Sequence, residues 1–225
     1  MTMRSMSGVL AFAALMALGG CSSTMVEPEH YSGFLPDYQR LKEEESASGA
    51  KVARWVDPSL NLSRYNSVYI EPSQFYPRPQ PTDQISQNTL KDIAQYYDTA
   101  LKRELGKVIR VVNSPAADSL VIRPAITAVS SSTEGLKPYE VIPIALVVAA
   151  TTTAVGARDQ EVQIATEAMF LDGGNSKLLA EVVRKGTGTA LENKETALTV
   201  QNIKPVVDGW AQDLRLAYER LKPRQ

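Results

Sequence analysis

The chain of 225 residues has one cysteine and one histidine, and both scarcities exclude chemistry. A single thiol, at Cys21, cannot form a disulfide within the chain, and clusters of cysteine or histidine are the usual source of metal ligands. His30 lies in a polar N-terminal stretch, whereas a Ser-His-Asp or Cys-His nucleophile needs a histidine fixed in a structured pocket. We therefore expect no catalytic residue, no metal and no cofactor.

The sequence also lacks an excess of either charge and a long apolar run. Lys and Arg total 24 against 25 Asp and Glu, and the net charge of −1 gives no electrostatic footprint for nucleic acid. The two apolar runs, residues 9–18 and 141–157, are shorter than the about 20 residues that a membrane-spanning helix needs. Nucleic-acid binding is excluded as a function class, and a permanent membrane span is disfavoured.

The first twenty residues have the three parts of a bacterial export signal. Arg4 supplies a positive charge, residues 9–18 form a short apolar core, and Gly19 and Gly20 precede a processing site. Together with Leu18 and the cysteine that follows, these glycines resemble the lipobox of bacterial lipoproteins. In a lipobox the signal is cut before the cysteine, whose thiol carries a diacylglycerol. The resemblance implies that residues 1–20 are removed and that the mature chain starts at Cys21.

Lipidation makes Cys21 a membrane tether, because acyl chains such as palmitate gain about 0.8 kcal/mol for each methylene buried in the bilayer. Ser22 follows the cysteine at the position where lipoproteins retained at the inner membrane typically carry aspartate. By this resemblance we expect transfer to the outer membrane, with the protein on its periplasmic face.

Residues 21–50 are mostly polar, which predicts a lipidated N-terminus and spacer that does not pack as a regular element. An aromatic and aliphatic stretch within it, YSGFLPDYQRL at residues 31–41, is expected to dock on the domain. Residues 51–225 have the length of one ordinary domain and are expected to form a single periplasmic unit.

In the first part of that domain, the pattern predicts strands around one helix. Residues 67–72 alternate as a strand that stops at a proline, and the proline-rich residues 76–81 are expected to be extended. Thr82 or Asp83 is expected to cap a helix that ends near Gly106. The apolar stripe of this helix is Leu90, Ile93, Tyr97, Leu101 and Leu105. Short strands are predicted at residues 108–112 and 120–129.

In the second part, residues 161–171 predict a strand with one buried face and one polar row that faces solvent. A turn at residues 172–176 and a return strand at 177–188 complete a hairpin. A final helix is predicted from near Asn202 or Pro205. Its stripe is Val207, Trp210, Leu214, Ala217 or Tyr218, and Leu221. These elements predict an α+β fold, a two-layer sandwich in which two amphipathic helices pack on a mostly antiparallel sheet.

The uncharged segment from Val141 to Ala157 allows three interpretations. A buried helix or strand-like crossover that leads into the hairpin is favoured. A surface that binds a partner or faces the membrane comes second, because exposed apolar patches of this size usually contact something. A membrane-spanning helix is least favoured, since Pro143 and a threonine run interrupt the segment. The candidate partner surface consists of Ile144, Leu146, Val147 and Val148.

Carboxylates are the remaining candidates for chemistry. Asp57 or Glu71 paired with Glu161 or Glu167 would suit a glycosidase, but no spacing singles out a pair, and charges at alternating strand positions usually form the wet face of a sheet. The GTGT stretch at residues 186–189 is a weak signal for a phosphate site, and a turn is the favoured interpretation.

Four blocks of the sequence carry a family resemblance: residues 31–41, 55–72 and 119–129, and the hairpin at 167–183. The chain resembles the bacterial lipoproteins grouped as domain of unknown function 3313. The pattern of Asp57-Pro58, Tyr65 and Pro72 contributes most, and physically it indicates a turn entering a strand with an aromatic ring beside it. The resemblance implies an envelope location and supplies no established activity. The hairpin turn departs from the family by lacking its usual acidic residue after the glycine.

Together these observations predict a non-enzymatic envelope lipoprotein, anchored at Cys21 and facing the periplasm, that binds another envelope component or itself. The alternative is an auxiliary subunit of an envelope transport or assembly complex that docks through residues 141–157. An enzyme that acts on envelope polymers would need two carboxylates converging in a deep cleft.

Overall fold

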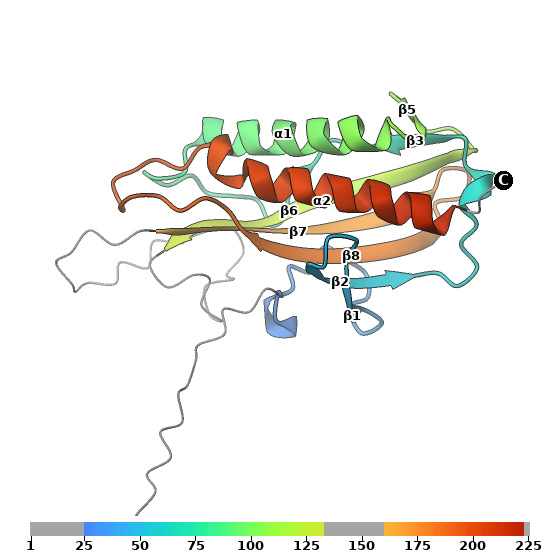
Figure 1. The fold of residues 1–225 in the computed structure, drawn as a ribbon, viewed down its shortest axis with the longest axis horizontal. Helices are drawn as coiled ribbons and strands as arrows, with labels where there is room; N and C mark the ends of the chain where they lie inside the picture. The colour runs from blue at the N-terminus through green and yellow to red at the C-terminus, as the bar shows by residue number, and fades with distance from the viewer. Residues whose placement is uncertain (1–24, 133–159, 223–225) are drawn as a thin grey trace, which may run out of the picture.

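One mixed sheet carries both long helices on the same face (Figure 1). The computed structural model describes residues 25–132 and 160–222. The helices are α1 (Gln87–Leu105) and α2 (Val200–Leu221), and two 3-10 turns, η1 and η2, lie at Pro28–His30 and Leu62–Arg64. Across the sheet the strand order is β1 (Lys42–Glu45), β2 (Lys51–Val56), β8 (Leu178–Thr187), β7 (Glu161–Asp172), β6 (Ser119–Ser132), β3 (Ser67–Ile70) and β5 (Arg110–Val112), and β4 (Gln74–Phe75) pairs with β6.

Neighbouring strands are antiparallel from β1 through β6, whereas β3 is parallel to both β5 and β6. The parallel pair β3 and β5 is connected through α1, as parallel strands require a crossover. The hairpin of β7 and β8 is present as predicted. The predicted α+β sandwich with a mostly antiparallel sheet is therefore confirmed.

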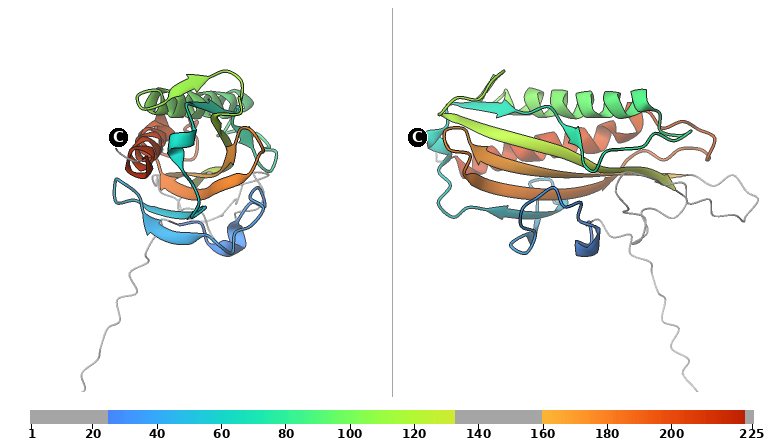
Figure 2. Two further views of the ribbon diagram at one scale, coloured as in Figure 1. Left: turned by 90° about the vertical axis from the view of Figure 1, so that its right-hand side faces the viewer. Right: turned by 180° about the vertical axis from the view of Figure 1, so that it is seen from behind.

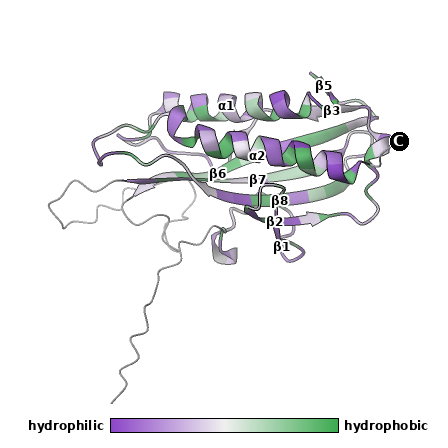
Figure 3. Cartoon of the chain, viewed as in Figure 1, coloured by the Kyte–Doolittle hydropathy of each residue, from purple (hydrophilic) through white to green (hydrophobic). Residues whose placement is uncertain are grey.

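The core lies between the helices and the sheet. All five predicted stripe residues of α1 are buried, with at most 5% of any of them exposed. They pack in one cluster with inward residues of the sheet such as Ile122, Ile126 and Ile164. Hydrophobic and hydrophilic positions alternate around both helices (Figure 3). The helical period of the sequence thus decides which side of each helix faces the sheet.

Helix α1 begins later than the sequence predicts. Ser86 is the N-cap, and its hydroxyl accepts a hydrogen bond from the amide of Thr89 at 3.0 Å. Thr82, the predicted cap, instead accepts from the amide of Ile85 at 3.0 Å in a turn that precedes the helix. Both side chains can accept from an amide three residues on, so local chemistry alone did not separate cap from turn.

Helix α2 begins before its predicted start, with Thr199 as its N-cap. The side chain of Asn202 reaches back and accepts from the amide of Thr199 at 2.9 Å. Val207, Trp210 and Tyr218 are buried as the stripe predicts, but Leu221 is 49% exposed at the last helical position.

Two carboxylates connect the helices to each other. Asp208 of α2 accepts from the hydroxyl of Tyr96 at 2.7 Å and from Arg103 at 2.8 Å. Glu104 of α1 is buried and accepts from Lys107 at 2.7 Å and from Arg215 of α2 at 3.2 Å. The bond from Lys107 lowers the pKa of Glu104 despite its burial. These contacts fix how the two helices lie side by side.

The turn between β7 and β8 is held by the block that resembles the family pattern. Tyr65 is buried, and its hydroxyl donates to Asp172 at the end of β7 at 2.8 Å. Asp172 also accepts from the amides of Gly174 and Asn175. Across the turn, Lys177 pairs with Asp57 at 2.7 Å, and this bond lowers the pKa of Asp57 to about 2. The pattern is therefore a structural clasp for the hairpin.

Part of the predicted spacer belongs to the sheet. Residues 42–45 form β1, which pairs antiparallel with β2. Beyond β1, Ser48 donates from its amide and its hydroxyl to Asp213 of α2, at 2.8 and 3.0 Å. Asp213 is only 1% exposed and also pairs with Arg184 at 2.9 Å. The polar composition of this stretch therefore gave no indication of the edge strand, or of the contact that Ser48 makes with the distant Asp213.

The glycines of the GTGT stretch let α2 approach the sheet. Strand β8 continues through Thr187, so Gly186 is a strand residue and the predicted turn is wrong. A Cβ atom on Gly186 would lie 2.5 Å from Val206 and 3.0 Å from Trp210, and one on Gly188 would lie 2.2 Å from the carbonyl oxygen of Asn202. Their role is close packing of helix on strand.

Gly186→Ala should therefore destabilise the protein, by about 1–3 kcal/mol for overpacking of a filled core. Gly209→Ala is the matched control, because Gly209 lies on α2, the helix that packs on Gly186, and a Cβ atom there would meet nothing within 4 Å. This control should be neutral or gain up to about 1 kcal/mol from helix propensity. Urea unfolding of the three proteins measures both effects, and equal stability of Gly186→Ala and wild type would contradict the packing role.

Candidate functional site

The sheet face opposite the helices is covered by residues 25–41, which we call the N-terminal strap (Figure 2). Val26 and Leu35 of the strap form a second apolar cluster with Ala128, Ala165 and Val183 of the sheet. The stretch at 31–41 thus docks on the domain as the sequence predicts. The strap adds a partial third layer to the two-layer sandwich.

Aromatic and cationic groups order the strap. The rings of Tyr31 and Tyr38 stack with centroids 4.4 Å apart and planes inclined by 11°. The guanidinium of Arg40 lies 3.8 Å from the ring centroid of Trp55, a cation–π distance. The hydroxyl of Tyr38 accepts from the amides of Gly33 and Leu35, which closes the strap on itself around a glycine with φ of +84°.

Glu167 of β7 is buried under the strap, with 1% of its surface exposed. Its carboxylate accepts from the hydroxyl of Tyr38 at 2.6 Å and from the amide of Ser32 at 3.0 Å. Burial raises the pKa of Glu167 above its ordinary value, and burial together with the bond to Glu167 raises the pKa of Tyr38 to about 12. Because the folded state binds this proton more tightly, the stability that Glu167 contributes is present at acid pH and is lost as pH rises through its folded pKa.

Glu181 of β8 is fully buried under the same strap. Arg40 donates to its Oε2 atom at 2.7 Å, while its Oε1 atom has no hydrogen-bond partner within the part of the chain that the structure describes. In the register of the hairpin, Glu167 is opposite Val183 and Glu181 is opposite Met169, so the two carboxylates are diagonal neighbours on one face.

The predicted polar row of β7 does not face solvent. Glu167 and Gln163 are each 1% exposed, because the strand is covered on both faces. Alternation of apolar and polar residues on a strand normally marks a wet face, but here the polar residues face the strap. A buried carboxylate that already accepts from a hydroxyl and an amide is a structural acceptor for the strap.

The site residues that the sequence predicts lie outside the described residues. These are the lipidation site Cys21 and the candidate partner surface at Ile144, Leu146, Val147 and Val148. His30 ends the turn η1 and is half-buried. Within residues 25–132 and 160–222, no three metal-ligating side chains gather and no helix is long and apolar enough to cross a membrane.

The four candidate carboxylates have separate partners. Asp57 pairs with Lys177, Glu71 pairs with Arg123, and Glu161 accepts from Gln163 and Thr187. Glu167 is covered by the strap. In the contacts of the described chain, no two of these four carboxylates share a hydrogen-bond partner.

Sequence reasoning missed Glu167, Glu181 and Asp213 as buried anchor points. A usable signal was present for the first two, because the docking stretch at 31–41 supplies tyrosine and arginine, which are suited to cover carboxylates. No local signal identified Asp213, whose partner Ser48 is 165 positions away.

The family model for the group described as protein of unknown function, DUF3313, matches residues 30–214. The chain belongs to this DUF3313 family. It is 42% identical over 209 residues to the uncharacterized lipoprotein YdcL of Escherichia coli K12, covering 93% of this chain and 94% of YdcL. The predicted family is therefore confirmed, and the lipoprotein relative indicates a bacterial envelope location. The match starts at residue 30, so it includes residues 30–41 of the strap.

Solved structures share only a distant likeness with this DUF3313 protein. The PelC dodecamer from Paraburkholderia phytofirmans is 12% identical with a TM-score of 0.40, over 77% of this chain and 98% of that one. A putative neuraminyllactose-binding hemagglutinin homolog from Helicobacter pylori is 12% identical with a TM-score of 0.36, over 73% and 86% of the two chains. Nothing about function follows from likenesses of this size.

Removal of one hydroxyl should loosen the strap. Tyr38→Phe takes away the donor to Glu167 and the acceptor for two strap amides, and we expect a loss of about 1–3 kcal/mol in the free energy of unfolding. Tyr31→Phe is the control, because Tyr31 contributes its ring to the same stack, whereas the hydroxyl that donates to Glu167 is that of Tyr38. Urea unfolding and hydrogen exchange of residues 32–40 measure the effect. Equal losses in both variants would show that the bond to Glu167 does not hold the strap.

Proposed function

We propose that this protein is a non-enzymatic lipoprotein of the bacterial outer membrane, anchored by acyl chains on Cys21, whose domain faces the periplasm and binds another envelope component or itself. The lipobox at Leu18–Cys21, Ser22 after the cysteine, and membership of the DUF3313 family support the location.

The short distance in sequence between the anchor and the strap is the observation on which the proposal depends. Met25 already packs against the apolar cluster of the strap, and it is four residues after Cys21. Four residues span at most about 14 Å, whatever their conformation. The strap that follows is held by the buried carboxylates Glu167 and Glu181. The anchored domain is therefore held next to the bilayer, not raised on the long spacer that composition suggested.

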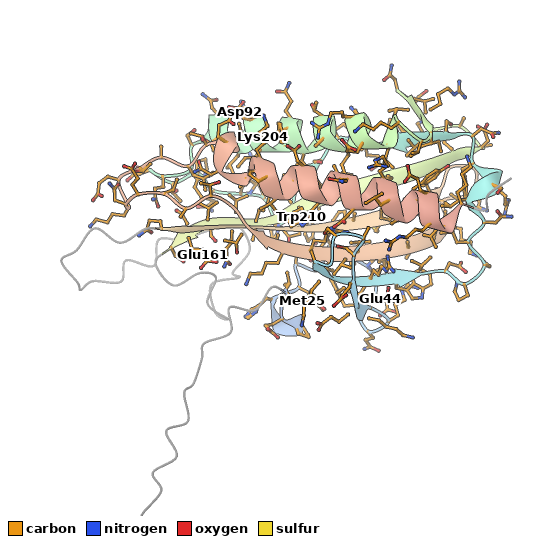
Figure 4. All side chains as sticks on the ribbon, in the orientation of Figure 1. Met25, Glu44, Asp92, Glu161, Lys204 and Trp210 are labelled. Carbon is orange, nitrogen blue, oxygen red and sulfur yellow. The ribbon has the colours of Figure 1, made fainter. Side chains whose placement is uncertain are left out.

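The strap also decides which side of the domain is nearer the lipid. Figure 4 shows Met25 on the strap side of the sheet and Asp92 on the outer side of α1, with the sheet and the helices between them. In the proposed anchoring, the strap side lies toward the bilayer and the exposed side of α1 is presented to the periplasm.

Lipidation is tested by Cys21→Ser. The variant lacks the thiol that carries the acyl chains, so we expect it in the soluble fraction of broken cells while the wild type sediments with outer membranes. The N-terminal peptide of the wild type should carry acyl mass. Membrane retention of the variant, with an unmodified N-terminus in the wild type, would contradict the anchor.

The close tether is tested with single introduced cysteines. Each is the only free thiol of the protein, because the thiol of Cys21, the one natural cysteine, carries acyl chains in the proposed lipoprotein. Bimane on Glu27→Cys should be quenched by lipids with nitroxide headgroups in reconstituted vesicles, and bimane on Asp92→Cys should not. Glu27 is six residues from the anchor and exposed. Insertion of twenty Gly and Ser residues before Met25 should abolish the quenching. Equal quenching at both positions would rule out the proposed orientation.

A further inference from the structure

A cavity of about 590 Å³ lies on the strap side of the sheet, where strap, sheet and connecting chain meet. Phe34 of the strap lines it together with Tyr69 of β3 and Arg123 of β6. Glu71, Gln74 and Tyr76 also line it, and they lie between the end of β3 and the residue just beyond β4. Its volume is within the range of about 300–1,000 Å³ that small-molecule sites usually occupy.

The apolar part of this cavity consists of aromatic rings together with Pro72 and Met169. The rings of Phe34 and Tyr76 lie with centroids 5.6 Å apart and planes inclined by 58°. Tyr76 is 38% exposed, and within the described part of the chain only Leu221 is another large hydrophobic residue with such exposure. A partly exposed ring beside a cavity offers a flat apolar surface and a hydroxyl to an occupant.

An ion pair forms the polar part. Arg123 donates to both carboxylate oxygens of Glu71, from Nε at 2.6 Å and from Nη2 at 3.0 Å. A guanidinium has five N–H donors, so this two-pronged contact leaves three, and the carboxylate oxygens keep free lone pairs. The side-chain amide of Gln74 adds one more donor and acceptor to the lining. Hydrogen-bond donors and acceptors therefore line the cavity together with the rings.

We infer that this cavity binds carbohydrate. A hydroxyl group both donates and accepts, so neighbouring hydroxyls of a sugar satisfy Arg123 and Glu71 together, and the apolar face of the sugar ring covers Tyr76. Other ligand classes fit less well. The paired charges of Glu71 and Arg123 cancel, so neither an anion nor a cation gains a net attraction, and an apolar chain would desolvate the ion pair without replacing its hydrogen bonds. A run of prolines has carbonyl acceptors but no backbone N–H group that could donate to Glu71.

This assignment names a ligand class for the binding role in the proposed function and rests on it. The cavity opens on the strap side, which is the side nearer the bilayer in the proposed anchoring. Two sources present sugar hydroxyls there, free envelope glycan and the headgroups of glycolipids, and both have the same chemistry toward the cavity.

The test is saturation-transfer NMR on the lipidated full-length protein in phosphatidylcholine nanodiscs, without sugar-based detergents. Chitotetraose and maltotetraose are the free-glycan probes, and nanodiscs that contain glucosyl diacylglycerol are the glycolipid arm. We expect transfer from protein to sugar ring protons in at least one arm, and the arm that responds identifies the source. Hexaproline is the probe for the competing ligand class, a proline-rich peptide.

Two variants and one control locate the binding. Tyr76→Ala should weaken the affinity at least about tenfold, and Arg123→Lys, which keeps the charge but loses the two-pronged contact, should weaken it as well. Leu221→Ala removes an apolar side chain that is even more exposed, at the end of α2, and should bind like the wild type. Thermal unfolding confirms that each variant is folded.

Absence of transfer to every sugar probe, equal transfer in Tyr76→Ala and wild type, or stronger transfer to hexaproline would each overturn the assignment. Membrane fractionation of the Cys21→Ser variant is independent of these measurements. A protein that is anchored but binds no sugar therefore refutes the cavity assignment alone and leaves the proposed lipoprotein role intact.

Discussion

The structure depends on the attachment of the N-terminal strap to two buried carboxylates. A mostly antiparallel sheet with helices on one face normally leaves its other face to water. Here Glu167 and Glu181 occupy that other face, and each would be costly to bury without a partner. Tyr38, Ser32 and Arg40 supply the partners, so the strap and the two glutamates require each other.

In the proposed lipoprotein, this arrangement also affects where the domain lies. A strap that packs within a few residues of Cys21 keeps the domain close to the proposed lipid anchor, because few residues remain between the sulfur and the sheet. Phe34 also lines the cavity beside Tyr76, so one segment contributes to anchoring geometry and to the candidate binding site. Ser48 extends the same N-terminal region to Asp213, which ties it to α2 on the other face.

Local sequence patterns predicted the helices and strands themselves better than they predicted what packs around them. The stripe from Leu90 to Leu105 and the alternation of β7 are properties of single segments, and both elements form where they were predicted. The start of α1 was misplaced because Thr82 and Ser86 have the same local capacity to accept an amide. The polar row of β7 was interpreted as wet because the cover over Glu167 comes from residues 129 and 135 positions away.

By itself the sequence determined the family and the α+β class, and it predicted the signal and the lipobox, because these depend on composition and on short-range order along the chain. Tertiary structure alone decided that Glu43–Glu45 belong to an edge strand and that Arg123 pairs with Glu71 beside Tyr76. It also decided that α2 packs closely on Gly186 and Gly188. Each of these needs contact between segments that are remote in sequence, and no local period or propensity encodes such contact.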